Sequence, residues 1–480
     1  MRFFLDPHGC AKNQVDAELL HGILLSQGWE ETAHPEEADL VLVNSCAFIE
    51  EAKTESIEAV LAARASCPGA KILLTGCLSQ RYGAALRELL PEADGFFGNG
   101  DLSRLPEVLA ALFSADARKT GSAPVLVPPQ EGVCCGARPK RFSFPRSAYV
   151  KLTEGCSNFC SFCAIPVIRG PLRSRTPEAV AAKCAALVAE GVFELNLVGQ
   201  DLAAFGTETL EVKPWENGFT GVSPLCGLLT RLAALPGDFR IRLLYLHPDH
   251  FPLDILPVMA ADRRFLPYFD LPFQSGDEDL LRKMNRKGNA ARYSALLDSI
   301  RRAFSSGPYG QAAVRTTFIT GFPGETDGAF AHTQAFLSES RFLWAGVFCY
   351  SREEDTAAFP MKPAVPKKKA AERREQLLRI QEDITAQELA RFIGQEITVL
   401  VEEPIPPAED EDGGGPRLAI GRAWFQAPEV DGSVVLCDEP DSADAAGIPL
   451  EPGSVVRAKV LRVCGADLEA AVLHPRGENC

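Results

Sequence analysis

Short apolar runs alternate with longer amphipathic stretches in the first part of the chain. Runs at 1–10, 38–46 and 70–77 have the length and composition of buried strands. Each is followed by a stretch with apolar residues at helical spacing, such as 17–28, which ends near a glycine. This alternation predicts a doubly wound α/β domain over residues 1–115.

A cysteine ends each of these three apolar runs, namely Cys10, Cys46 and Cys77. In an open parallel sheet, ligands bind in the crevice beyond the carboxyl ends of the strands. Three thiols that successive strands deliver to such a crevice predict the ligands of one metal centre.

A second and longer alternating array follows a segment rich in proline, glycine and basic residues at 116–144, which we interpret as a linker. Six βα units are two fewer than a closed eightfold barrel needs, so we expect an open, partial barrel over 145–365. Its strand-like runs lie at 147–156, 193–201, 241–248, 268–276, 314–325 and 345–353.

The last part of the chain changes character twice. Residues 366–392 form one charged, amphipathic stretch that predicts a connecting helix. Residues 393–480 contain short β-rich pieces between proline- and glycine-rich turns, which predicts a small β-barrel of a class that includes nucleic-acid-binding folds.

Composition limits the class of protein. The 480 residues carry a net charge of −15, which disfavours a non-specific nucleic-acid binder and suits a basic partner. No apolar stretch is long enough to span a bilayer and no signal peptide is evident, so we expect a cytoplasmic protein. Fifteen cysteines in a reducing compartment then indicate metal binding or catalysis rather than disulfides.

The segment EGCSNFCSFCAIPVIRG holds a second cysteine set with the spacing C-x3-C-x2-C, formed by Cys156, Cys160 and Cys163. Structural zinc sites use four protein ligands, and no fourth ligand stands close by. Three soft thiolates with one ligand missing suit a 4Fe–4S cluster that keeps one iron open to bind and cleave a substrate.

The remaining cysteines and three arginines near the cluster loop can be explained without a role in catalysis. We expect adjacent Cys134 and Cys135 to be inert thiols of the linker, and burial or exposure accounts for the remaining cysteines in helix or strand patterns or at the tail. Three arginines after the cluster loop either hold a polar substrate or form a solvated face. The cysteines are Cys184, Cys226, Cys349, Cys437, Cys464 and Cys480, and the arginines are Arg169, Arg173 and Arg175.

The cluster loop, with an aromatic before its last cysteine, resembles the radical S-adenosylmethionine (radical SAM) superfamily. GCAKNQVDAE, VNSCAFIEEAKTES and TGCLSQRY, around the first cysteine set, resemble the methylthiotransferase family within it. The resemblance covers essentially the whole chain, with a C-terminal TRAM β-barrel. It implies that Cys156, Cys160 and Cys163 hold the 4Fe–4S cluster that cleaves SAM, and that the first set holds a second 4Fe–4S cluster.

The resemblance also implies residues near SAM. The sequence GFPGET is expected beside SAM, although it could be only a tight βα turn. Gln200 and Asp201, at a strand end, would contact SAM or substrate, or face solvent. The residues that we expect to bind SAM are Phe162, Gln200, Gly321, Pro323, Gly324 and Glu325.

Two branches of the family differ in substrate. One adds a methylthio group to the β-carbon of an aspartate in a small-subunit ribosomal protein of the uS12 type, and the other modifies C2 of adenosine in transfer RNA. CAKNQVD, RGPLRSR, RIRLLYLHPD and GRAWFQAPEVDG favour the first branch, whereas QSG at 274–276 is more typical of the second.

Charge gives an independent argument for the protein substrate. Residues 391–480 contain 17 acidic and 7 basic residues, a balance of −10 that suits a basic ribosomal protein better than RNA. The family implies an electron donor such as flavodoxin or ferredoxin, and we expect a monomer. An alternative from another class is an RNA-binding TRAM protein with a structural metal.

Overall fold

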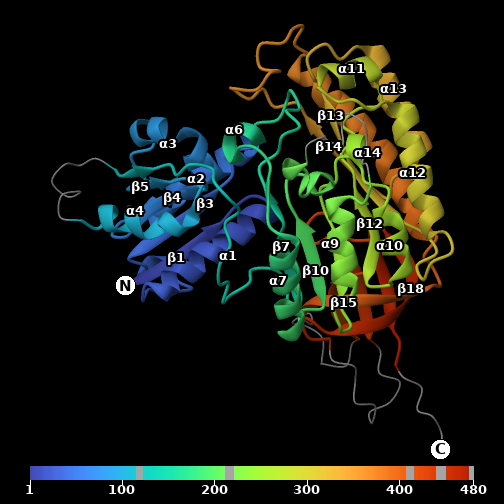
Figure 1. The fold of residues 1–480 in the computed structure, drawn as a ribbon, viewed down its shortest axis with the longest axis horizontal. Helices are drawn as coiled ribbons and strands as arrows, with labels where there is room; N and C mark the ends of the chain where they lie inside the picture. Colours follow the sequence, from blue (N-terminus) through green and yellow to red (C-terminus); the bar gives the residue numbers. More distant parts are fainter. Residues whose placement is uncertain (115–122, 211–220, 407–415, 439–449, 475–480) are drawn as a thin grey trace, which may run out of the picture.

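The computed structural model describes residues 1–114, 123–210, 221–406, 416–438 and 450–474. They form an N-terminal α/β domain, a larger α/β domain and a C-terminal β-barrel, as predicted (Figure 1). The N-terminal domain, in blue, lies beside the β7 edge of the second sheet, and the red barrel lies at one end of that sheet. None of the helices among the described residues is long and apolar enough to cross a membrane.

The N-terminal domain is an all-parallel sheet in the order β2-β1-β3-β4-β5-β6. Helices cover both faces, so the central strand β3 (Leu40–Ser45) is buried along its whole length. The other strands are β1 (Arg2–Pro7), β2 (Glu30–Glu31), β4 (Lys71–Gly76), β5 (Gly95–Phe97) and β6 (Val125–Leu126). The helices are α1 (Ala11–Ser26), η1 (Pro35–Glu37), α2 (Glu50–Ser66), α3 (Cys77–Leu89), η2 (Leu102–Arg104) and α4 (Leu105–Leu112).

The predicted linker also takes part in this sheet. Its strand β6 pairs with β5, with Val125 opposite Phe96 and Leu126 opposite Phe97. The segment is therefore an edge strand as well as a connection, and its first residues, 116–122, lie outside the described part of the chain.

The second domain is an open sheet of parallel strands in the order β14-β13-β12-β11-β10-β7, which confirms the partial barrel. Its strands are β7 (Ser147–Lys151), β10 (Glu194–Val198), β11 (Arg240–Leu243), β12 (Phe265–Asp270), β13 (Ala313–Thr320) and β14 (Trp344–Cys349). A two-stranded ribbon pairs β8 (Thr153–Glu154) with β9 (Arg173–Ser174). The helices are α6 (Ile165–Arg169), α7 (Pro177–Ala189), η3 (Leu202–Ala204), η4 (Thr207–Thr209), α9 (Pro224–Ala233), η5 (Pro248–His250), α10 (Ile255–Ala261), α11 (Glu278–Lys283), α12 (Ala290–Phe304) and α13 (Asp327–Ser340).

The strands end earlier than the predicted runs, and the difference is largest at β12. The apolar run at 268–276 predicts a strand there, but β12 spans Phe265–Asp270 and ends before Pro272. Beyond Asp270 the regular pairing with β13 stops, and a single bridge remains, between Gln274 and Phe318.

The connecting helix α14 (Lys367–Ala390) follows the prediction and packs against β14 and α13. The last domain is a closed barrel in the order β15-β16-β17-β19-β18. Its strands are β15 (Glu396–Ile405), β16 (Arg417–Arg422), β17 (Val434–Asp438), β18 (Val455–Cys464) and β19 (Asp467–Val472).

Buried ion pairs join this barrel to the second domain. Glu194 of β10 lies 3.0 Å from Arg422 of β16 and 3.1 Å from Arg242 of β11. In addition, the indole N–H of Trp344 donates to the carbonyl of Phe425 at 2.6 Å. Because buried charges must be neutralised by partners, these contacts hold the barrel in one position against the sheet.

Candidate functional site

The first cysteine set lies at one edge of the N-terminal sheet. Cys10 follows β1, Cys46 follows β3 and Cys77 begins α3 after β4, and these three strands are neighbours in the sheet. Gly9 has a φ of +94°, and a Cβ there would lie 3.0 Å from the Cβ of Cys46. Glycine at this position therefore lets the end of β1 approach the second cysteine closely.

The three thiols change one another's pKa values by electrostatic repulsion. Burial, together with the negative charges of Cys77 and Cys10, raises the pKa of Cys46 to about 12. Burial also raises the pKa of Cys77, whereas at Cys10 the charges of Lys12 and Arg169 outweigh burial and lower the pKa. A bound metal would add positive charge that deprotonates the thiols.

The second cysteine set lies on the loop between β8 and α6. The loop is closed by a hydrogen bond from the N–H of Cys163 to the carbonyl of Cys160 at 3.0 Å. Burial raises the pKa of Cys156 well above its usual range, and the other two thiolates act in the same direction. Burial and Cys160 raise the pKa of Cys163 to about 12.

Both sets have the donor chemistry of an iron–sulfur site, with three thiols each. Among the described residues, no three His, Cys, Asp or Glu side chains surround a position suited to a single metal ion. A 4Fe–4S cluster spaces its thiolates further apart than one ion does, because each thiolate binds a different iron. The three soft thiols of each set fit a 4Fe–4S cluster by their donor chemistry.

A buried polar network contacts the second cysteine set through Asn158. The amide of Asn158 lies 3.3 Å from the sulfur of Cys156 and donates to Asp201 at 2.8 Å. His250 Nε2 lies 2.7 Å from the same carboxylate, and its ring stacks on that of His247, 4.6 Å away. Burial acts to raise the pKa of Asp201, but His250 outweighs it and the pKa is lowered. Asp201 thus faces inward and supports the loop rather than facing solvent.

The side chain of Gln200, unlike that of its neighbour Asp201, makes no hydrogen bond with the described residues. Both polar atoms of its side-chain amide are buried, and neither has a hydrogen-bond partner in the described structure. A buried amide without a partner costs free energy, which is typical of a group that binds a ligand. This position fits the predicted contact with SAM.

The GFPGET turn is tied to the connecting helix. The carboxylate of Glu325 accepts the N–H of Gly321 at 2.7 Å and pairs with Arg373 of α14 at 2.6 Å. The N–H of Gly324 donates to the carbonyl of Pro363 at 2.8 Å. The contacts of this turn are those of a packed βα turn, in which Glu325 already has partners.

Phe162 lies in the cluster loop. Its ring is partly buried and packs with a small apolar cluster that includes Met284 and Phe322. Phe322 immediately precedes Pro323 in the GFPGET turn, so this cluster places the turn beside the loop.

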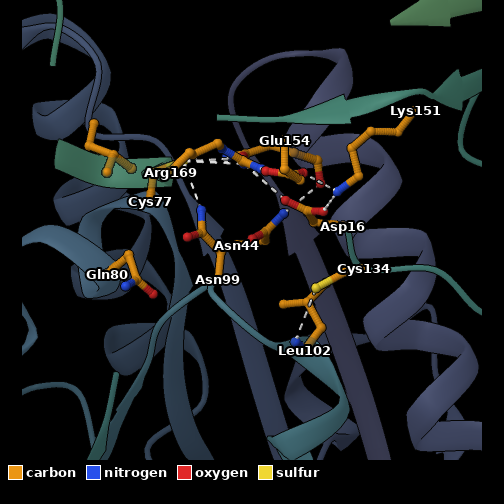
Figure 2. Close-up of polar contacts among 12 residues, drawn as sticks. Asp16, Asn44, Cys77, Gln80, Asn99, Leu102, Cys134, Lys151, Glu154 and Arg169 are labelled. Atoms are coloured by element: carbon orange, nitrogen blue, oxygen red, sulfur yellow. Dashed lines mark hydrogen bonds and ion pairs between the residues drawn. The ribbon is translucent and has the colours of Figure 1, made fainter. Parts of the chain in front are cut away.

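Arg169 connects the two cysteine sets. It ends α6, directly after the cluster loop, and its Nη2 lies 3.4 Å from the sulfur of Cys77 and 2.6 Å from Oδ1 of Asn13 (Figure 2). It also pairs with Glu154 and Asp16, each at 2.9 Å. Arg169 is therefore buried at the domain interface and forms no solvated face.

Lys151 completes this network. It pairs with both Asp16 and Glu154, and all the side chains involved are at most 6% exposed. Figure 2 shows the two cations and two carboxylates lying side by side between α1 and the start of the second domain.

The other two arginines of the predicted group, Arg173 and Arg175, lie outside this network. They donate to backbone carbonyls, Arg173 to Gly132 at 2.6 Å and Arg175 to Ala179 at 3.2 Å.

Three family models match successive parts of the chain. They are the Uncharacterized protein family UPF0004 at residues 2–98, the Radical SAM superfamily at 150–337 and the TRAM domain at 393–473. Among solved structures, a radical S-adenosylmethionine methyltransferase, TsrM, from Kitasatospora setae, with cobalamin and a 4Fe–4S cluster bound, has a TM-score of 0.54 at 14% identity. It covers 75% of this chain and 73% of that one. This likeness concerns the fold.

Curated relatives match from end to end. The ribosomal protein uS12 methylthiotransferase RimO of Treponema denticola is 52% identical over 475 residues, which cover 98% of this chain and 100% of the relative. The protein of the same name from Desulfosudis oleivorans is 37% identical, covering 98% and 99%. The chain belongs to the ribosomal protein uS12 methylthiotransferase family. Membership in this family confirms both the predicted family and the predicted branch.

In this uS12 methylthiotransferase-family chain, the sequence analysis did not predict that Asp16, Lys151 and Glu154 lie at the domain interface. The run SAYVKLTEGC contains Lys151 and Glu154, and charged residues in a strand that is expected to be buried indicate ion-pair partners elsewhere in the fold. Of the cysteines with ordinary explanations, Cys134 accepts the N–H of Leu102 at 3.5 Å, and Cys480 lies outside the described residues. Cys135, Cys349 and Cys464 are exposed, Cys437 is half-buried, and Cys184 and Cys226 are buried.

Proposed function

We propose that this protein is a radical SAM enzyme that adds a methylthio group to the β-carbon of an aspartate in ribosomal protein uS12. The observation that carries the proposal is the contact of Arg169 with Cys77, because it joins the helix after one cysteine set to a member of the other. The names of the full-length relatives support the same activity and substrate.

Each cysteine set has its own task in this proposal. Cys156, Cys160 and Cys163 would hold the 4Fe–4S cluster that cleaves SAM, and Cys10, Cys46 and Cys77 would hold a second cluster that presents sulfur. When bound, the first cluster and SAM would supply a radical that removes a hydrogen atom from the substrate β-carbon, and the second cluster would supply methylated sulfur to the carbon radical left there. The amide of Gln200 would bind SAM, and Phe162, Gly321, Pro323, Gly324 and Glu325 would line or shape its site.

The protein's own residues keep the two tasks together. The network of Asp16, Lys151, Glu154 and Arg169 fixes the cysteine edge of the first domain against the strand ends of the second. Because these residues are buried, they also exclude water from one side of the space between the cysteine sets. Orientation of this kind lowers a barrier by holding reacting groups close together before reaction.

The partner would be the basic ribosomal protein uS12, attracted by the acidic C-terminal part of the chain. Residues 391–480 have a balance of −10, and opposite charges raise the rate of association. Flavodoxin or ferredoxin would donate electrons, and we propose a monomer. The described cysteines are free thiols, which fits a cytoplasmic location.

Two measurements test the proposal. Mass spectrometry of a uS12 loop peptide and of transfer RNA, each incubated with the reconstituted protein, SAM and reductant, should find a methylthio group on the aspartate of the peptide alone. Modification of the transfer RNA alone would refute the substrate.

The second measurement compares Cys46→Ala with Cys349→Ala, which changes an exposed cysteine outside both sets. Cys46→Ala should lower iron from about eight to about four per chain and abolish methylthio transfer while SAM cleavage continues. Cys349→Ala should keep all the iron. Equal iron in both variants would refute the second cluster.

A further inference from the structure

One segment of this acidic chain is strongly basic. Residues 282–292 contain five basic and no acidic residues, whereas the whole chain has a net charge of −15. The segment begins at the end of α11, which lies at the end of the second domain away from the C-terminal barrel (Figure 1). A local group of positive charges in an acidic protein attracts a partner of opposite charge.

Three of the five cations are on the surface. Lys283, Lys287 and Arg292 are all exposed, and Arg292 donates to the carbonyl of Lys287 at 3.1 Å. Neither Lys283 nor Arg292 has an ion-pair partner among the residues that the structure describes. These three residues form what we call the basic surface.

The other charges of this region are used within the protein. Arg282 pairs with Asp279 on the same helix at 2.7 Å, and Arg286 is buried. The carboxylate of Asp249 accepts the hydroxyl of Tyr293 at 2.7 Å and a backbone N–H of the segment at 2.8 Å. The basic surface therefore keeps positive charge that faces solvent.

The segment is hydrogen-bonded to the loop that carries the second cysteine set. The side-chain amide of Asn285 donates to the carbonyl of Phe159 at 3.0 Å, and the carbonyl of Met284 accepts the N–H of Ser161 at 3.0 Å. Phe159 and Ser161 are the two neighbours of Cys160 in the sequence. The basic surface thus lies beside a proposed ligand of the cluster that cleaves SAM.

Apolar groups accompany these cations. Phe159 is 61% exposed and has a φ of +52°, which is strained for a bulky residue and is typical of functional sites. A groove of about 320 Å³ borders Arg292 and is lined by apolar side chains that include Leu253 and Leu296. Exposed apolar groups with a charged rim are typical of a surface that binds another protein.

We propose that the basic surface, together with Phe159, is the docking site of an acidic electron-carrier protein. This inference rests on the proposed function and assigns the place at which its electron donor binds. One electron would leave the carrier, which is oxidised, and enter the SAM-cleaving cluster, which is reduced, and no atom is transferred. Electron transfer slows steeply with distance, so a carrier has to approach a cluster ligand such as Cys160 closely. The basic substrate uS12 would be repelled here, because like charges oppose association.

The test measures the complex of an acidic flavodoxin with the full-length, cluster-reconstituted protein in the absence of SAM. Calorimetry gives the Kd, and stopped-flow absorbance gives the rate at which flavodoxin hydroquinone reduces the cluster. Lys287→Glu combined with Arg292→Glu should weaken binding and slow this reduction roughly tenfold or more at low salt. The difference should shrink as salt is added, since salt screens exposed charges.

A matched control is Arg457→Glu combined with Lys459→Glu, which makes the same change of net charge at two exposed residues of β18 in the C-terminal barrel. This control should bind flavodoxin like the wild type. Dithionite should reduce the same amount of cluster in every variant, measured by EPR, because a small reductant needs no docking surface. A flavodoxin whose surface acids are replaced by lysine should prefer the charge-reversed variant to the wild type.

The inference is overturned if the charge-reversed variant binds flavodoxin as tightly as the wild type, or if it loses affinity for ribosomal RNA instead. Should charge reversal lower the iron content, Lys287→Gln combined with Arg292→Gln provides the same comparison without reversed charges. Loss of iron in that neutral variant as well would assign these residues a structural role and overturn the inference.

Failure of the proposed function would look different. In that case the wild type, reduced with dithionite, would form no 5′-deoxyadenosine from SAM and would not methylthiolate the uS12 peptide. If the wild type does both with dithionite but its binding of flavodoxin does not depend on the basic surface, only the inference fails.

Discussion

Replacement of Arg169 by methionine should weaken the contact between the first two domains and lower the stability of the protein. Among the described residues, the change leaves the buried carboxylates of Asp16 and Glu154 with Lys151 as their remaining ion-pair partner. Breaking a buried ion pair costs about 3–5 kcal/mol, because a carboxylate remains buried without its counterion. This is a large part of the ~5–15 kcal/mol that stabilises a typical domain.

The assay is thermal unfolding of the metal-free protein, so that cluster occupancy does not contribute. A loss of this size corresponds to a Tm lower by roughly 6–20 °C for domains of this length. The matched control is Arg282→Met, because Arg282 is 68% exposed and pairs with Asp279 on the surface, where an ion pair contributes about 0–1 kcal/mol. Glu154→Gln added to Arg169→Met should restore part of the stability, since it removes one uncompensated charge. If Arg169→Met lowers the Tm no more than Arg282→Met, the reasoning about the network is wrong.

Two further predictions follow from buried polar groups. Burial acts to raise the pKa of Glu194, but Arg422 and Arg242 outweigh it and lower the pKa to about 2. The ionised carboxylate therefore adds about 3 kcal/mol to the free energy of unfolding above pH 5. This contribution is lost as the pH falls from about 4.5 toward 2. Stability measured by denaturant unfolding should therefore fall less steeply between pH 5 and pH 3 in Glu194→Gln than in the wild type, and equal slopes would contradict this. Gln200→Leu should leave the Tm unchanged, because it removes a buried amide without a partner, and should raise the Kd for SAM about tenfold in calorimetry. A lower Tm with unchanged SAM binding would assign Gln200 a structural role instead.

The elements that carry the cysteines could be predicted because local patterns specify them. Cys10, Cys46 and Cys77 each follow an apolar run, and such runs form parallel strands whose carboxyl ends meet at one edge of the sheet. The spacing of the second set lies within eight residues, so it needs no tertiary contact to be recognised. The predictions failed where the pattern did not specify an end, as at β12, whose apolar run continues past the last ladder residue.

The sequence by itself determined the three domains, the two cysteine sets and the family. Only the tertiary structure decided which charges neutralise one another. Asp16 and Lys151 are 135 residues apart in the chain, and Glu194 and Arg422 are 228 apart. Periodicity reports which side of an element is buried, but a buried charge is stabilised by whichever partner the fold brings within a few ångströms.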